Sequence, residues 1–176
     1  LARTAGADVF VSLHADALPP ESGRATGATI YTLSEEASDL ASQRLAERHD
    51  QSDLLAGLDL AGQGDEIALV LMELARTETQ PRSEALARAL VDGIGAAAGP
   101  MNSRPLRSAG FSVLKAPDIP SVLVELGFLS SAADRARLRV AGGMAESVSQ
   151  NVVAELDGAT GEFLVVGAHH DTQPGS

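Results

Sequence analysis

The chain has 176 residues, enough for one domain with a sizeable core, and its hydrophobic content of 44% excludes wholesale disorder. The net charge of −11 and the 3% aromatic content disfavour binding to nucleic acid or to an anionic membrane surface. There is no cysteine, which excludes disulfides and thiolate metal sites, and no apolar run approaches the ~20 residues of a membrane span. The chain opens at Leu1 rather than at methionine, so we expect a fragment in which a missing signal peptide is uninformative.

Two strands and a helix are predicted in the first third of the chain. Residues 8–14 form a nearly continuous apolar run, as in a buried central strand, and residues 28–33 are rich in β-branched and aromatic types. Thr32 and Glu35 have the spacing of a capping box, and apolar residues at one-face spacing predict a helix after them. Residues 18–27, with two prolines and two glycines, are predicted to be a loop.

The middle of the chain is predicted to be helical. Residues 51–64 carry three glycines and little periodicity, which indicates a loop. The apolar spacing then predicts a helix over 65–77. A second helix is expected to begin at Pro81, because proline suits a first turn, and to end near residues 99–100.

A second buried strand is predicted late in the chain. Residues 111–115 indicate a short strand, and 120–128 (PSVLVELGF) a strand buried on both faces that ends at Glu125. Ser131 and Asp134 have the spacing of a helix cap. A last helix, marked by Met144, Val148 and Val152, is expected to end by Gly158.

Strands mixed with helices of these lengths predict an α/β fold, with a mostly parallel twisted sheet and helices on both faces. In such a fold the carboxyl ends of neighbouring parallel strands lie on a common rim. His14 and Glu125 each end a buried strand, so we expect both at that rim.

These two residues suggest a site. An unpaired carboxylate is costly to bury, so Glu125 is not expected to be core filler, although a surface glutamate or half of an ion pair is the alternative. A lone histidine at a strand end is more often structural than a ligand. Together, His14 and Glu125 fit a zinc hydrolase, in which neutral imidazole holds the ion and a carboxylate accepts a proton from water and returns it to the leaving group.

Two stretches resemble signatures of the zinc-dependent N-acetylmuramoyl-L-alanine amidases. They are residues 7–17 (ADVFVSLHADA) and residues 111–130 (FSVLKAPDIPSVLVELGFLS). Their order, the length between them and residues 31–34 (YTLS) also look like the family, so the resemblance covers about residues 1–157.

The resemblance implies a function and a location. His14 would be a zinc ligand and Glu125 the catalytic glutamate of a Zn²⁺ enzyme outside the cytoplasm, in the periplasm or cell wall. Its partner would be peptidoglycan, cleaved at the amide between N-acetylmuramic acid and L-alanine of the stem peptide. Some amidases of this type carry a regulatory helix over the zinc and are regulated by an activator protein. Residues 52–79 lie in that place; Asp65, Glu66 and Glu73 are candidate plugs, with a solvated helix face as the alternative.

The resemblance also implies a truncation. The family carries two more zinc ligands, a histidine and a glutamate, upstream of the strand that starts at Asp8. We therefore expect residues 1–157 to be a partial, zinc-hydrolase-like catalytic domain with its first strand missing, an unpaired apolar edge and no activity as a fragment. The non-enzyme alternative is a peptidoglycan-binding relic.

The last residues do not look like an amidase ending. We expect 158–176 to be a linker and the start of a second, truncated segment. Residues 161–176 resemble the opening strand and His-x-Asp motif of zinc aminopeptidases, in which His169 would be a zinc ligand and Asp171 its nearby carboxylate. A zinc exopeptidase is therefore the alternative enzyme function. The non-functional alternative is that His-His-Asp occurs by chance in a polar tail. We predict that 159–176 lie outside the amidase core; the competing idea is that 163–168 pair with the open edge and bring His169 beside His14.

Overall fold

The computed structural model describes residues 2–18, 25–55, 66–97, 100–137, 151–157 and 163–169. Its elements, in chain order, are α1 (Ala2–Ala5), β1 (Val9–His14), β2 (Ala28–Leu33), α2 (Leu40–Leu55), α3 (Glu66–Ala97), β3 (Met101–Ala109), the 3₁₀ turn η2 (Ser112–Leu114), β4 (Ser121–Glu125), α4 (Ala132–Arg137), β5 (Asn151–Asp157) and β6 (Phe163–His169). Among these residues, no helix has the length and apolar character needed to cross a membrane.

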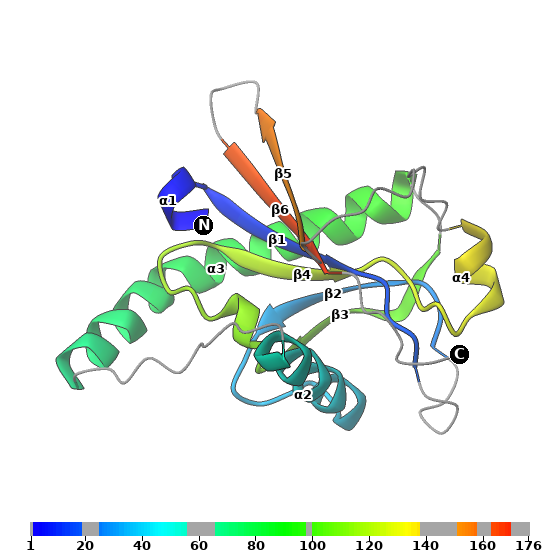
Figure 1. The fold of residues 1–176 in the computed structure, drawn as a ribbon, viewed down its shortest axis with the longest axis horizontal. Helices are drawn as coiled ribbons and strands as arrows, with labels where there is room; N and C mark the ends of the chain where they lie inside the picture. Colours follow the sequence, from blue (N-terminus) through cyan, green and yellow to red (C-terminus); the bar gives the residue numbers. More distant parts are fainter. Residues whose placement is uncertain are drawn as a thin grey trace.

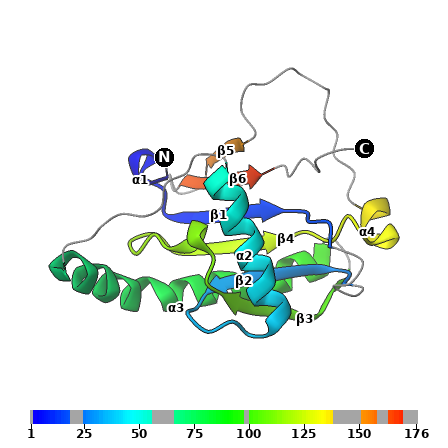
Figure 2. The same cartoon turned by 60° about the horizontal axis from the view of Figure 1, so that its bottom comes forward.

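The strands form one six-stranded sheet in the order β3-β2-β4-β1-β6-β5 (Figure 1). β1 is parallel to β4 and β6, and β2 is parallel to β3, whereas the β2–β4 and β5–β6 pairs are antiparallel. Helices α2 and α3 lie on opposite faces of the sheet (Figure 2). The predicted α/β fold, with a mostly parallel sheet covered on both faces, is confirmed.

Alternation along the strands divides the core into two layers. On the α2 face, Leu45 and Ala46 of the helix belong to a cluster with Tyr31, Phe111 and Leu123. On the α3 face, the cluster consists of Ala87 of the helix and the sheet residues Val11, Ile30, Val122 and Val124. Because Leu123 faces α2, Glu125, two residues later, faces α2 as well. Phe10 packs on the same side, so Ser12 and His14 share that face.

The long helix α3 corrects the prediction of two helices. It runs from Glu66 to Ala97 through Pro81, so Pro81 does not begin a new helix. A proline inside a helix costs ~3 kcal/mol through a lost backbone hydrogen bond and a clash with the preceding turn. Packing of the following half of α3 on the sheet offsets this cost, through Leu86, Ala87, Leu90, Val91 and Ile94.

The start of α2 also differs from the prediction. Asp39, not the Thr32–Glu35 pair, caps the helix: its carboxylate accepts hydrogen bonds from the Ser42 amide at 2.8 Å and the Ser42 hydroxyl at 2.9 Å. The same carboxylate pairs with Arg107 of β3 at 3.2 Å. At the other end, residues 51–55 belong to α2 rather than to a loop, and 56–65 lie outside the described residues.

The edge strand β3 was not predicted, and residues 112–114 form η2 instead of the predicted strand. β3 is polar and contains Pro105, which an edge strand tolerates because one side of its backbone needs no partner. Gly27 lets β3 approach the start of β2: its φ is +83°, and a Cβ there would lie 2.6 Å from the Met101 carbonyl carbon.

The end of the chain corrects two predictions. Residues 151–157, including Val152, form strand β5 rather than a helix, while Met144 and Val148 lie outside the described residues. β6 lies in the main sheet, where Leu164–Ala168 pair in parallel with Val9–Leu13 of β1. The expectation that 159–176 stand apart from the core is therefore wrong for β6, and the edge of β1 is covered. The division of the chain at residue 158 stays a prediction.

Candidate active site

His14 and Glu125 lie side by side at the carboxyl ends of the two central strands. In the parallel register of β1 and β4, His14 pairs directly with Glu125, as the common rim predicted. Both side chains are buried, with 7% of His14 and none of Glu125 exposed. Such burial is expected at the centre of a sheet covered on both faces.

The chain segments that leave the two strands are joined by hydrogen bonds. The Asp16 amide donates to Oε1 of Glu125 at 2.8 Å. The Leu126 amide donates to the His14 carbonyl at 2.9 Å, and the Leu129 amide to the Asp16 carbonyl at 2.7 Å. These bonds fix the carboxylate of Glu125 and the backbone of Asp16 in one arrangement.

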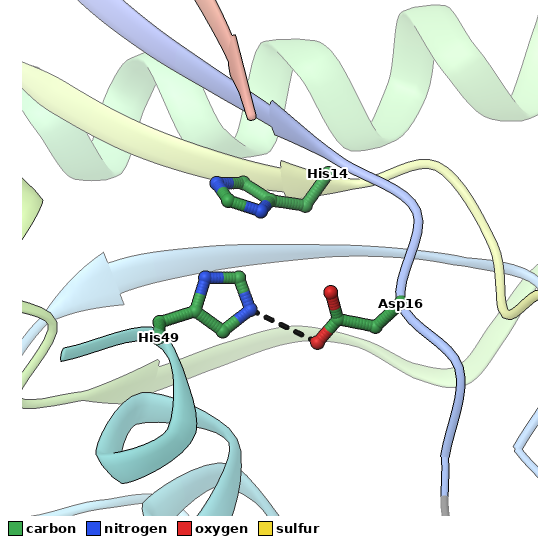
Figure 3. A group of neighbouring side chains, drawn as sticks. All are labelled: His14, Asp16 and His49. Atoms are coloured by element: carbon green, nitrogen blue, oxygen red, sulfur yellow. Dashed lines mark hydrogen bonds and ion pairs between the residues drawn. The ribbon is translucent and has the colours of Figure 1, made fainter. Parts of the chain in front are cut away.

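Helix α2 brings a second histidine to this rim. His49, 6% exposed, points from the helix toward Asp16 and His14 (Figure 3). Its Nε2 lies 3.0 Å from Oδ2 of Asp16, and its ring centroid lies 4.2 Å from that of His14. The three residues each offer a ligand atom, and these atoms all lie within 4.8 Å of one another.

The surroundings hold these side chains in place. Nε2 of His14 lies 2.9 Å from the Ser12 hydroxyl, two residues earlier on the same face of β1. The ring of His49 contacts Phe111 edge-on, with centroids 5.6 Å apart. Both imidazoles are therefore oriented by the core rather than by solvent.

Electrostatics favour the ionised form of Asp16. Burial raises the pKa of its carboxyl group, but the hydrogen bond with His49 and the attraction of His49, His14 and Arg48 outweigh burial and leave the pKa below its usual value. Arg48 contributes from the partly exposed side, where its Nη2 lies 3.6 Å from Oδ2 of Asp16. The rim thus presents a buried carboxylate, favoured in its ionised form, beside two imidazoles.

The donor set fits a metal ion. Two imidazoles and one carboxylate are ligands that Zn²⁺ takes in proteins, and three protein ligands are the usual number in a catalytic zinc site. Sequence analysis placed His14 and Glu125 correctly at one rim but missed Asp16 and His49 as members of the group. Asp16 lies within the 7–17 motif, so the sequence held a signal for it. No local pattern marks His49, which lies 33 residues after Asp16 in the chain.

Other predicted residues are not brought to this rim within the described part of the chain. Asp65 lies outside the described residues, and the side chains of Glu66 and Glu73 are not described, so the plug hypothesis stays a prediction. In β6, Ala168 pairs with Leu13, which places the backbone of His169 at the level of His14. The side chain of His169 is not described, and Asp171 lies outside the described residues.

Fold and site together define an α/β protein with a buried group of imidazoles and carboxylates at the ends of parallel central strands. The model of the N-acetylmuramoyl-L-alanine amidase family matches residues 1–155. The chain is 33% identical to the amidase AmiC of Escherichia coli O6:H1 over 88% of its length, 34% identical to AmiC of Neisseria meningitidis over 75%, and 35% identical to AmiA of Salmonella typhimurium over 74%.

The chain belongs to the N-acetylmuramoyl-L-alanine amidase family. It spans 37%, 31% and 45% of the length of these three relatives, respectively.

Proposed function

We propose that this chain is a metal-dependent hydrolase of peptidoglycan that cleaves the amide bond between N-acetylmuramic acid and L-alanine. The observation that carries the proposal is the direct pairing of His14 with Glu125 at the ends of two parallel strands, beside further metal-ligand side chains. Membership of the amidase family supports the bond that is cleaved.

In this proposal His14 holds the ion and Glu125 acts as the general base and acid. A bound Zn²⁺ would supply Lewis-acid activation of water and of the scissile carbonyl. Glu125 would accept a proton from the attacking water at one carboxylate oxygen and return it to the leaving amine. The hydrogen bond from the Asp16 amide to Oε1 holds the carboxylate in a fixed orientation for both transfers.

The proposal also includes the cellular location of the enzyme and its regulation. A peptidoglycan substrate requires the site to work outside the cytoplasm, in the periplasm or cell wall. Glu125 has no exposed surface, so substrate reaches it only after the groups that cover it move. An activator protein is one agent that could move them.

The test compares the full-length parent of this chain with its Glu125→Gln variant, using purified muropeptides, supplied zinc and chromatography of released stem peptides. We expect release by the unmodified parent and a loss of about 100- to 10,000-fold in the variant, because glutamine keeps the shape but removes the base. Metal content should be the same in both proteins. Release of free amino acids instead would favour the exopeptidase alternative.

The control is Glu47→Gln, an exposed glutamate on α2 whose carboxylate accepts a hydrogen bond from Gln43. It should cleave at the unmodified rate. No stem peptide from the unmodified parent, or near-normal cleavage by Glu125→Gln, would contradict the proposal. Retention on peptidoglycan without cleavage would point to the binding relic.

A further inference from the structure

We infer that Thr29 is a positioning residue for Glu125, and that its hydroxyl donates a hydrogen bond to the Glu125 carboxylate during the reaction. This inference rests on the proposed function and deepens it, because it assigns a role to a residue that acts through the general base. Thr29 is the second residue of β2 (Ala28–Leu33), and only 1% of it is exposed.

Strand β2 places Thr29 directly beside Glu125. In the antiparallel register of β2 and β4, Thr29 pairs with Glu125 and Tyr31 pairs with Leu123. Tyr31 and Leu123 both belong to the core cluster on the α2 face, so the side chains of Thr29 and Glu125, two residues further along each strand, also lie on that face. The Cβ atoms of directly opposed residues are about 4.5–5.5 Å apart, so a hydroxyl and a carboxylate can meet by side-chain rotation alone.

The hydroxyl of Thr29 is buried and has no hydrogen-bond partner among the residues that the structure describes. By contrast, the buried hydroxyls of Ser12, Ser42 and Thr79 each have one. A buried hydroxyl without a partner destabilises the fold, and valine would fill the same space in a strand without that cost. The hydroxyl is therefore explained by a contact that it makes when the site is at work.

The two strands beside β4 approach the carboxylate of Glu125 from opposite sides. β4 lies between β1 and β2 in the sheet (Figure 2). Oε1 of Glu125 accepts a hydrogen bond from the Asp16 amide on the β1 side, and Thr29 lies on the β2 side. Donors from both sides fix the plane of a carboxylate more firmly than the amide alone, and a fixed plane is what repeated proton transfer at one oxygen requires.

A hydroxyl also suits a group that changes its protonation state. It can donate to a carboxylate and accept from a carboxylic acid, whereas a backbone amide only donates. Thr29 can therefore stay bonded to Glu125 before and after Glu125 takes the proton from water. The proton itself passes from water to Glu125 and then to the leaving amine, and Thr29 neither gains nor loses one.

The competing account is that Thr29 serves only as a β-branched residue that fills the α2 face. Thr29→Val keeps the branched shape and removes the hydroxyl, whereas Thr29→Ser keeps the hydroxyl and removes the methyl group. If only shape matters, Thr29→Val should cleave normally. If the hydroxyl matters, Thr29→Ser should cleave better than Thr29→Val.

The experiment combines urea unfolding of the 176-residue chain with steady-state cleavage of purified muropeptides by the full-length parent, with zinc supplied. In Thr29→Val we expect the urea midpoint to rise by about 0.5–1 M, because an unpaired buried hydroxyl is removed. We expect kcat to fall by about 10- to 100-fold with KM within about twofold, since the base loses its orientation but substrate binding is kept. Thr29→Ser should keep kcat within about threefold.

Thr32→Val is the matched control on the same strand. The hydroxyl of Thr32 donates to the Arg107 carbonyl at 3.5 Å, and its side chain shares the α3 face with Ile30. This variant should cleave at the unmodified rate, and its urea midpoint should not rise.

A normal kcat in Thr29→Val, or an equal loss in Thr29→Ser and Thr29→Val, would overturn the inference. A lower kcat together with a lower urea midpoint in Thr29→Val would also overturn it, because the hydroxyl would then be structural. The two proposals fail in different ways. No cleavage by the unmodified parent removes the proposed function and this inference with it, while cleavage that Thr29→Val leaves unchanged removes this inference alone.

Discussion

Replacing Asp134 by alanine should destabilise the fold strongly, although the residue lies outside the two sequence motifs. Its carboxylate is fully buried at the start of α4 and accepts hydrogen bonds from the amides of Phe128 at 2.9 Å and Gly27 at 3.0 Å. It also accepts from the Thr26 hydroxyl at 2.9 Å and pairs with Arg137 at 2.6 Å. One side chain thus joins the segment after β4 to the start of β2.

The magnitude follows from which partners would be left buried. The amides of Gly27 and Phe128 would lose a charged acceptor, at a cost of about 1–3 kcal/mol each, or about 2–6 kcal/mol together. The Arg137 side chain is 27% exposed and can turn to water, so the ion pair itself adds little. With a urea m value of about 2 kcal/mol/M, the unfolding midpoint of Asp134→Ala should fall by about 1–3 M.

Asp118→Ala is the matched control. Asp118 also pairs with an arginine, Arg3, at 2.6 Å, but the two side chains are 43% and 67% exposed. An exposed pair contributes about 0–1 kcal/mol, so its midpoint should move by less than about 0.5 M. The assay is urea unfolding of all three proteins, followed by far-ultraviolet circular dichroism. Equal midpoints for Asp134→Ala and Asp118→Ala would refute the reasoning, because Asp134 differs from Asp118 in its burial and in the backbone amides that it accepts from.

The same variant has a defined pH dependence. Burial raises the pKa of Asp134, but the hydrogen bonds from Phe128, Arg137, Thr26 and Gly27 outweigh it and leave the pKa below its usual value. A carboxyl group with a lowered pKa in the folded state stabilises the fold above its unfolded pKa of about 3.9, and this stabilisation is lost as pH falls through the folded value. The difference between the unmodified chain and Asp134→Ala should therefore shrink as the pH is lowered below about 4.

Two further predictions concern the sheet. Burial, with smaller effects of charges nearby, raises the pKa of Tyr31 to about 12, and Tyr31 is the sole tyrosine. Ultraviolet titration should show no phenolate near pH 10, and stability should fall as pH rises from about 10 toward the folded value; a midpoint near 10 would contradict its burial. Deleting 158–176 removes β6 and uncovers β1, so light scattering should show self-association. Deleting 170–176 should leave the chain unassociated, and a monomeric 1–157 would argue against the pairing.

The strands in the buried interior of the sheet could be predicted from the sequence, whereas strands at its edges could not. The apolar runs of the sequence predict β1, β2 and β4, because strands inside a sheet that is covered on both faces consist mostly of apolar residues. β3 is polar because it lies at the edge, where propensity is weak and Pro105 is tolerated. The sequence of β5 predicts a helix because a short apolar run fits both the helical and the strand period, and only its pairing with β6 decides between them.

Among the site residues, too, some could be predicted from the sequence and others could not. A polar residue that closes an apolar strand can be recognised in the sequence. His14 and Glu125 could therefore be placed at one rim from the apolar pattern and the expected topology. His49 lies in the middle of a helix with nothing local to distinguish it from a surface histidine. Its position follows from how α2 crosses the sheet, which depends on contacts such as that of Leu45 with Phe111 and Tyr31. Contacts of this kind are absent from any local window.

The central strand β1 finds its partners late. Asp16, just after β1, and Glu125, at the end of β4, are separated by 109 residues, and β6 lies later still. At a synthesis rate of about 5–20 residues per second, β1 would wait about 5–20 s for β4. Such a topology folds slowly and leaves an apolar strand exposed meanwhile. Yield of the folded chain should therefore depend on holding chaperones more than on the stability of the finished sheet.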